Sequence, residues 1–180
     1  MKIVKTSIEG LLIIEPTVFK DERGFFMETY KKDLLNSYGI TKEFVQDNHS
    51  KSTKGVLRGL HFQHSPRSQG KLVRVIHGEV FDVAVDLRKN SPTYLQWDSV
   101  VLTEENKKQF YVPERFAHGF YVMSETAEFI YKCTDTYAPE SEDGIMWNDP
   151  IINIEWPEGE RILSEKDQNY KSASLLKTDF

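Results

Sequence analysis

The chain has 180 residues and a formal net charge of −5, a length that fits one domain able to bury a core without disulfide bonds. Its single cysteine, Cys133, excludes an intrachain disulfide framework and a cysteine-based zinc cluster. An acidic chain with no apolar run near the ~20 residues of a membrane span, and with no signal-peptide pattern, predicts a cytoplasmic protein that binds neither nucleic acid nor membrane.

Short strands dominate the pattern after a first predicted helix over residues 31–38, which ends at Gly39. Residues 80–87 alternate between an apolar face and a mixed face, which is the period of a strand. A preceding strand is predicted over residues 72–76, with a tight turn between the two. Later strands are predicted over residues 99–102, 109–112, 118–123 and 127–133. So many short strands, separated by turn signals, favour an antiparallel sandwich or barrel.

A second short helix is predicted over residues 164–169. Ser164 would cap its N-terminus, and Asp167 stands three positions on, where a carboxylate completes a capping pair. By this pattern alone, Asp167 is a residue of the helix start.

The five histidines give two interpretations. His61 and His64 are three residues apart, so a strand would place them on opposite faces, and the chain has no His-x-His pair; we therefore expect no metal site. His64 and His77 are interpreted as hydrogen-bonded structural residues. His61 lies between two apolar residues, and an imidazole with a pKa near ~6.5 can serve as a general base at neutral pH.

Three cations stand beside glycines, in Arg23-Gly24, Arg58-Gly59 and Gly70-Lys71. Such pairs suit an anion site, since arginine can grip phosphate oxygens with two hydrogen bonds, and any single pair also suits a solvated surface. Phe25 and Phe26 follow the first pair, and their rings could stack on a nucleobase or pack in a core.

Tyr131 has an equally divided interpretation. It lies in the predicted strand over residues 127–133, and Tyr137 shares its parity if the strand continues. The phenol of Tyr131 could donate a proton or could only line a barrel.

Several motifs together resemble one family. They include Asp21 to Glu28 (DERGFFME), Phe44 to Ser50 (FVQDNHS), Leu57 to Gln63 (LRGLHFQ), Gly78 to Asp86 (GEVFDVAVD) and Tyr131 to Tyr137 (YKCTDTY). On these residues the chain resembles the dTDP-4-dehydrorhamnose 3,5-epimerases over nearly its whole length to Asp167, and the LRGLHFQ block is the most specific part.

The resemblance implies roles for individual side chains. His61 would be the general base, Asp167 its carboxylate partner, Tyr131 the proton donor on the opposite face of the sugar, and Lys71 the cation facing the C4 oxygen. The side chains implied to bind the substrate are Arg23, Phe26, Glu28, Gln46, Asn48, Arg58, Lys71, Asp82, His118, Tyr137, Glu142 and Lys166.

The fold that the resemblance implies is all-β, a cupin-like jelly-roll barrel with a few short helices, in one domain over residues 1–180 with an extension after about residue 167. It also implies a homodimer with exchanged N-terminal strands, so that Arg23, Phe26 and Glu28 would serve the partner's site.

The implied reaction inverts C3 and C5 of dTDP-4-dehydro-6-deoxy-D-glucose without a metal, nicotinamide or flavin. Both carbons flank the 4-keto group, so one oxyanion site could stabilise the enolate of either step. Two alternatives stay open: a single-centre 3- or 5-epimerase with the same base and acid, and a non-catalytic sugar-binding cupin, which predicts that the base and acid are lost.

Overall fold

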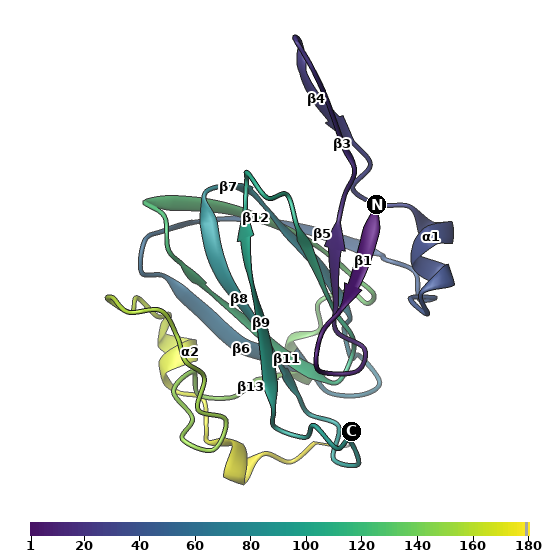
Figure 1. The fold of residues 1–180 in the computed structure, drawn as a ribbon. Coiled ribbons are helices and arrows are strands. Elements are labelled where there is room, and N and C mark those ends of the chain that lie inside the picture. The colour runs from purple at the N-terminus through teal and green to yellow at the C-terminus, as the bar shows by residue number, and fades with distance from the viewer. Residues whose placement is uncertain (179) are drawn as a thin grey trace.

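Two antiparallel sheets face each other in the computed structural model, which describes residues 1–178 and 180 (Figure 1). The first has six strands in the order β1-β2-β10-β7-β12-β5, and the second has five in the order β13-β6-β11-β8-β9. Bounds in the first sheet are Lys2–Lys5 (β1), Leu12–Glu15 (β2), Gln109–Val112 (β10), Lys71–His77 (β7), Thr126–Cys133 (β12) and Gln46–Thr53 (β5). In the second they are Glu142–Gly144 (β13), Leu57–Gln63 (β6), Phe116–Val122 (β11), Glu79–Asp86 (β8) and Trp97–Thr103 (β9).

The main core fills the space between the sheets. Alternate residues of each strand point inward, so the six-stranded sheet contributes Val73, Phe110 and Phe129, and the five-stranded sheet contributes Leu102 and Phe120. The Phe120 and Phe129 rings stack across the two sheets with their centroids 4.4 Å apart. This contact fixes the distance between the walls of the barrel.

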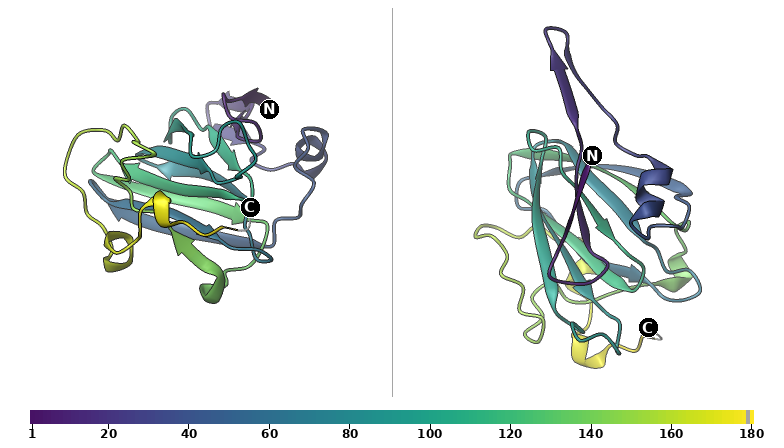
Figure 2. Two further views of the ribbon diagram at one scale, coloured as in Figure 1. Left: turned by 90° about the horizontal axis from the view of Figure 1, so that it is seen from below. Right: turned by 45° about the vertical axis from the view of Figure 1, so that its right-hand side comes forward.

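Each outer sheet face is covered by a different part of the chain. Helix α1 (Lys32–Ser37) places Leu35 on the outer face of the six-stranded sheet, against Ile14 and Leu72. Residues 145–178 cover the outer face of the five-stranded sheet, where Ile152 and Ala173 are buried (Figure 2). The segment after residue 167 thus packs on the barrel.

A two-stranded hairpin of β3 (Val18–Asp21) and β4 (Gly24–Met27) projects beyond the barrel (Figures 1 and 2). Its aromatic side chains are largely in solvent, with 60% of Phe19, 56% of Phe25 and 66% of Phe26 exposed. An isolated hairpin of this kind is marginal in water.

Both predicted helices are confirmed within a residue at each end. The first is α1, and the second is α2 (Glu165–Gln168), whose N-cap Ser164 accepts a hydrogen bond from the Asp167 amide. Two 3-10 turns, η1 (Pro139–Ser141) and η2 (Ala173–Leu175), complete the elements.

The predicted strands over residues 72–76, 80–87, 99–102, 109–112, 118–123 and 127–133 all correspond to observed strands, although β11 begins at Phe116. In the part of the chain that the structure describes, no helix has both the length and the apolar character needed to span a bilayer. The cytoplasmic location stays a prediction.

Candidate active site

A cavity of about 250 Å³ is lined by side chains from both sheets. Its lining residues are Gln46, Asn48, His61, Phe62, Gln63, Gln69, Lys71, Tyr131, Cys133, Tyr137 and Glu142. Seven of the side chains predicted for the site are among them, which brings together residues from β5, β6, β7, β12 and β13.

His61 and Asp167 form a hydrogen-bonded pair at this cavity. The His61 Nε2 lies 2.5 Å from Oδ1 of Asp167, whose side chain is 3% exposed. Asp167 also receives a hydrogen bond from the Ser164 hydroxyl to Oδ2, at 2.8 Å. The residue that the sequence pattern assigned to the helix start is therefore both a helix residue and the partner of His61.

The pair leaves one nitrogen of His61 free to act. A carboxylate can only accept, so Nε2 carries the hydrogen and Nδ1 keeps its lone pair in the neutral ring. Burial lowers the pKa of His61 below its usual 6.5, against the opposing influence of Asp167. Burial alone would raise the pKa of Asp167, but hydrogen bonds from His61 and Ser164 outweigh it and lower that pKa. The ring is therefore neutral, and the carboxyl ionised, near pH 7.

A close approach of two strands determines where His61 lies. At Gly59, just before it on β6, the backbone φ is +132°, and a Cβ would stand 2.5 Å from the Cα of Gly119 on β11. Only glycine fits both the conformation and the contact. Arg58 and His61 are placed on either side of this crossing.

Lys71 enters the cavity from β7, on the opposite sheet. Burial lowers the pKa of its ammonium, while the nearby groups Cys133, Asp82 and Glu142 oppose that shift. No hydrogen bond to its Nζ is found among residues 1–178 and 180. Lys71 is half-buried, and an ammonium without a direct partner at the cavity wall can bind an anionic oxygen.

Tyr131 also comes from the six-stranded sheet, on β12, and thus faces His61 from the opposite wall. Its ring packs on Phe129 at 5.9 Å between centroids, which holds it in place. Burial raises the pKa of its phenol, with Arg58 opposing. The hydroxyl therefore keeps its proton at neutral pH.

A second buried imidazole–carboxylate pair lies deeper between the sheets. His118 Nε2 is 2.9 Å from Asp82 Oδ1, and both side chains are buried. Burial raises the pKa of Asp82, while His118 and Lys71 lower it. The charges of Asp82 and Lys71 interact, but neither Asp82 nor His118 lines the cavity.

A chain of hydrogen bonds runs along the rim of the cavity. The Tyr137 hydroxyl donates to Glu142 Oε2 and the Lys166 ammonium donates to Oε1, each at 2.8 Å. On the β5 side, Gln46 accepts from the Tyr137 amide and donates to Asn48 Oδ1, at 2.8 and 3.0 Å. Hydrogen bonds along the rim thus link the predicted residues Gln46, Asn48, Tyr137, Glu142 and Lys166.

Arg58 lies beside a second cavity of about 550 Å³, which shares His61 with the first and also contains Lys166 and Asp167. Its guanidinium Nε and Nη2 both donate to the Ser52 hydroxyl at 3.2 Å, and no carboxylate of residues 1–178 and 180 pairs with it. A neutral hydroxyl does not balance the positive charge of the guanidinium, so Arg58 can still bind an anionic ligand.

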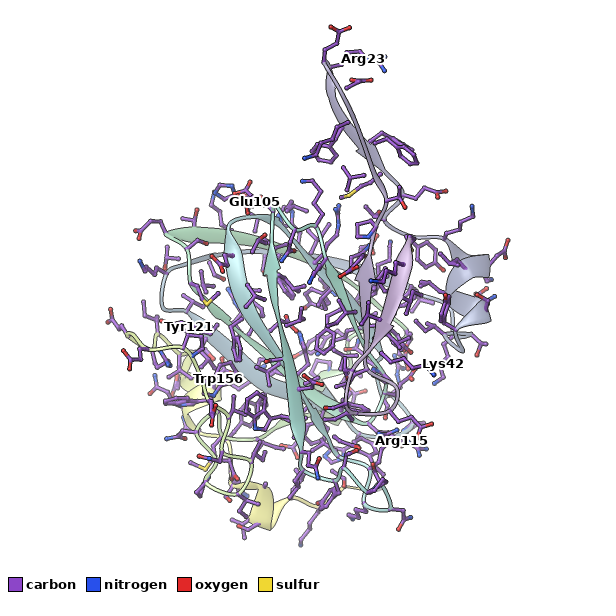
Figure 3. All side chains as sticks on the ribbon, in the orientation of Figure 1. Arg23, Lys42, Glu105, Arg115, Tyr121 and Trp156 are labelled. Carbon is purple, nitrogen blue, oxygen red and sulfur yellow. The ribbon has the colours of Figure 1, made fainter. Side chains whose placement is uncertain are left out.

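Three further predicted residues lie on or beside the projecting hairpin and line neither of these two cavities. Arg23 lies at the far end of the projecting hairpin, where it bonds to Asp21 (Figure 3). Phe26 is on β4 of the same hairpin, and Glu28 follows it, 3.7 Å from Lys31. The single chain therefore does not bring them to His61.

Sequence reasoning missed Phe62, Gln63 and Gln69 of the cavity lining, and four further side chains of the site. Ser52 holds Arg58, Ser164 holds the Asp167 carboxylate, and Cys133 lines the cavity. The fourth, Tyr170, packs its ring against His61. The capping pattern offered a signal only for Ser164.

The predicted structural histidines lie outside the cavity. His64 pairs with Asp143 at 3.1 Å, and His77 lies 3.4 Å from Glu104. Within the described residues, no three His, Cys, Asp or Glu side chains gather as a metal site would require.

A model of the family described as dTDP-4-dehydrorhamnose 3,5-epimerase matches residues 5–174. The chain belongs to this family. The dTDP-4-dehydrorhamnose 3,5-epimerase of Shigella flexneri is 58% identical over 170 residues, 94% of each chain. The resemblance and enzyme class predicted from the sequence are thereby confirmed.

Solved structures of the epimerase family share the fold. The dTDP-6-deoxy-D-glucose-3,5-epimerase of Legionella pneumophila, in complex with dTDP-4-keto-L-rhamnose, matches with a TM-score of 0.95 at 54% identity, over 98% of this chain and 94% of that one. A 3'-monoepimerase from Streptomyces bikiniensis, in complex with dTDP-quinovose, matches with a TM-score of 0.88 at 30% identity, over 94% and 86%. These matches confirm the all-β, cupin-like fold.

Proposed function

We propose that the chain inverts C3 and C5 of dTDP-4-dehydro-6-deoxy-D-glucose to give dTDP-4-dehydro-L-rhamnose. The observation that carries the proposal is the placement of His61 and Tyr131 on opposite walls of one cavity, with Lys71 beside them. The dTDP-sugar bound in the Legionella relative supports the substrate class.

The first step is removal of a proton from the carbon next to the ketone. The free Nδ1 of neutral His61 takes the proton, and the electron pair of the broken C–H bond moves into the enolate, ending as charge on the C4 oxygen. Asp167 stabilises the imidazolium that forms and holds the ring in the required tautomer.

Lys71 stabilises the charge that develops on the C4 oxygen. Its ammonium is in place before the reaction and is partly desolvated, the condition under which one such donor is typically worth ~3–4 kcal/mol. Because C3 and C5 both flank C4, the same cation serves both inversions.

Inversion is completed when Tyr131 gives its proton to the other face of the carbon. The new C–H bond forms as the enolate returns to the ketone. The phenolate then regains a proton from solvent, and the His61 imidazolium releases its proton to solvent, which restores both groups. A phenol is a weak acid at neutral pH, but an enolate is basic enough to accept its proton. No metal, nicotinamide or flavin takes part in these steps.

The cations and rim residues bind the nucleotide and diphosphate in this proposal. Arg58 faces the diphosphate, supported by Lys166, while Gln46, Asn48, Tyr137 and Glu142 hold the substrate at the rim. Asp82 stabilises the Lys71 ammonium electrostatically, and His118 holds Asp82 by a hydrogen bond.

A homodimer explains the hairpin. Exposed aromatic side chains on a projecting two-stranded ribbon are unfavourable in water and are typical of an interface. In the dimer each hairpin lies against the partner, and Arg23, Phe26 and Glu28 reach the partner's cavity to contact diphosphate and base.

Turnover of dTDP-4-dehydro-6-deoxy-D-glucose in deuterated water tests the function. Each inversion replaces one carbon-bound hydrogen with a solvent proton, so we expect deuterium at both C3 and C5 of the product by NMR. Deuterium at one centre alone would favour the single-centre epimerase, an activity that this fold also carries in the Streptomyces protein. A sugar-binding cupin predicts no deuterium at either centre.

A further inference from the structure

The chain places a second phenol, Tyr170, against the His61 ring just after helix α2. The two ring centroids are 5.7 Å apart, with an interplanar angle of 62°, so an edge meets a face. The Tyr170 hydroxyl is buried and has no hydrogen-bond partner among the residues that the structure describes. None of the proposed chemical steps uses this residue.

The backbone leaves room for the Tyr170 ring at one glycine. Gly144 of β13 is directly opposite His61 of β6 in the sheet register. A Cβ at Gly144 would lie 2.5 Å from Cζ and 2.6 Å from Cε2 of Tyr170. The ring therefore occupies the position beside His61 where a side chain of the neighbouring strand would otherwise stand.

The chain is anchored on both sides of Tyr170. Before it, the Asn169 amide donates to the Lys166 carbonyl at 3.1 Å and ends helix α2. After it, the Met146 amide donates to the Lys171 carbonyl at 3.1 Å. Farther on, the Ala173 amide donates to Asp149 Oδ2 at 2.8 Å. The ring is thus held against His61 by backbone hydrogen bonds that do not involve its own hydroxyl.

We propose that Tyr170 is a positioning residue for the base: its ring holds the His61 imidazole in the plane of the Asp167 hydrogen bond and keeps water away from that bond. The inference rests on the proposed role of His61. In this proposal only the ring positions His61. The hydroxyl has no role, because it has no hydrogen-bond partner among the described residues.

The groups around His61 predict the direction in which its pKa changes when the Tyr170 ring is removed. The charged groups that influence His61 are Asp167 and Lys166 from α2, Lys71 from β7 and Glu142 from β13. Burial raises the pKa of Tyr170, so it stays neutral and adds no charge. Burial is the largest influence on the pKa of His61 and lowers it. Removing the ring admits water, so the pKa of His61 should rise toward 6.5.

The experiment compares Tyr170→Ala and Tyr170→Leu, which remove the ring, with the matched control Tyr170→Phe, which removes only the hydroxyl. The His61 resonances are assigned by comparison with His61→Ala and titrated by NMR. For the ring-deleting variants we expect an upward shift of the His61 pKa, a fall in kcat of about tenfold or more, and a KM within about twofold. Tyr170→Phe should match the wild type in all three. If Tyr170→Ala does not fold, Tyr170→Leu decides.

Two results would overturn the proposal. A ring-deleting variant that loses thermal stability and activity while His61 titrates as in the wild type would show a merely structural role. A Tyr170→Phe variant as impaired as Tyr170→Ala would show that the hydroxyl matters. The NMR titration needs no substrate, so its failure is separable from a failure of the wild-type enzyme to incorporate deuterium, which would overturn the proposed function instead.

Discussion

Three features of its surroundings make His61 reactive. Asp167 accepts from Nε2, burial between the sheets keeps the ring neutral, and the β6–β11 crossing at Gly59 places the ring at the cavity. Histidine and aspartate often form such pairs, but here 106 positions of the sequence separate His61 from Asp167. Local patterns cannot reveal such a pair.

Replacing His61 by Ala should reduce turnover by at least ~10²–10⁴-fold, because the proton-transfer step loses its base. Binding of dTDP, measured by calorimetry at fixed salt, should change little. His77→Ala is the matched control, since His77 lies at the exposed end of β7, beside Glu104 and outside the cavity. Turnover of a correctly folded His61→Ala variant within tenfold of the wild type would reject His61 as the base.

The pH dependence of kcat/KM should show an acid limb below pH 6.5. His61 acts as a base only when neutral, and burial lowers its pKa, so activity is lost only as pH falls through this lowered value. Asp167→Asn removes the carboxylate that raises the pKa of His61, so the limb should move to still lower pH while the plateau falls. An acid limb above pH 6.5 in the wild type would contradict this assignment.

Helix α2 contributes both to the stability of the fold and to the position of the Asp167 carboxylate. It has only four residues, and Ser164 both caps it and binds the Asp167 carboxylate. The sequence predicted the helix and its cap from the spacing of Ser164 and Asp167. It did not predict that the capping partner faces His61, and only the family resemblance indicated this.

Ser164→Ala should therefore affect both stability and rate. Loss of an N-cap typically costs ~1 kcal/mol, which should appear as a lower melting temperature. The Asp167 carboxylate also loses a hydrogen bond that lowers its pKa, so kcat should fall by up to about tenfold. Ser164→Thr retains the hydroxyl and should recover most of both. A lower melting temperature with an unchanged kcat would separate the cap from the catalytic pair.

The strands that sequence reasoning found and missed differ for a physical reason. β8 and β12 alternate apolar and polar residues because they line the core, so their period was visible. β5 was not predicted, because its inward positions include the polar Gln46, Asn48 and Ser52, which serve the cavity and Arg58. β3 and β4 were missed because neither has a buried face. The polar residues that serve the site in β5, and the solvent exposure of β3 and β4, thus remove the alternation of apolar and polar residues by which a strand is recognised.

At the scale of the whole molecule, the barrel supplies the cavity but leaves the hairpin without a partner. Within one chain, Arg23 lies at the tip of a ribbon that extends away from the barrel (Figure 3), and Phe26 is on β4 of the same ribbon. A twofold dimer would let each hairpin complete the other subunit's site. Arginine and an exposed aromatic ring fit a diphosphate and a nucleobase.

Mixing two impaired variants tests this exchange. In a heterodimer of His61→Ala and Arg23→Ala, one site combines both defects, while the other has an intact His61 and an intact hairpin. Random mixing should therefore restore about a quarter of the wild-type activity. Each homodimer alone should show low kcat/KM. If mixing restores nothing while size measurements show that subunits have exchanged, the hairpin serves its own chain.

Turnover by Tyr131→Phe in deuterated water separates the base on one wall of the cavity from the acid on the other. His61 and Lys71 remain in this variant, so proton removal continues, while delivery from the opposite face is lost. We predict that deuterium enters the unreacted substrate by return to the original face and that little inverted product accumulates in the same sample. Deuterium exchange and inversion falling in parallel, or inversion continuing near the wild-type rate, would contradict the account.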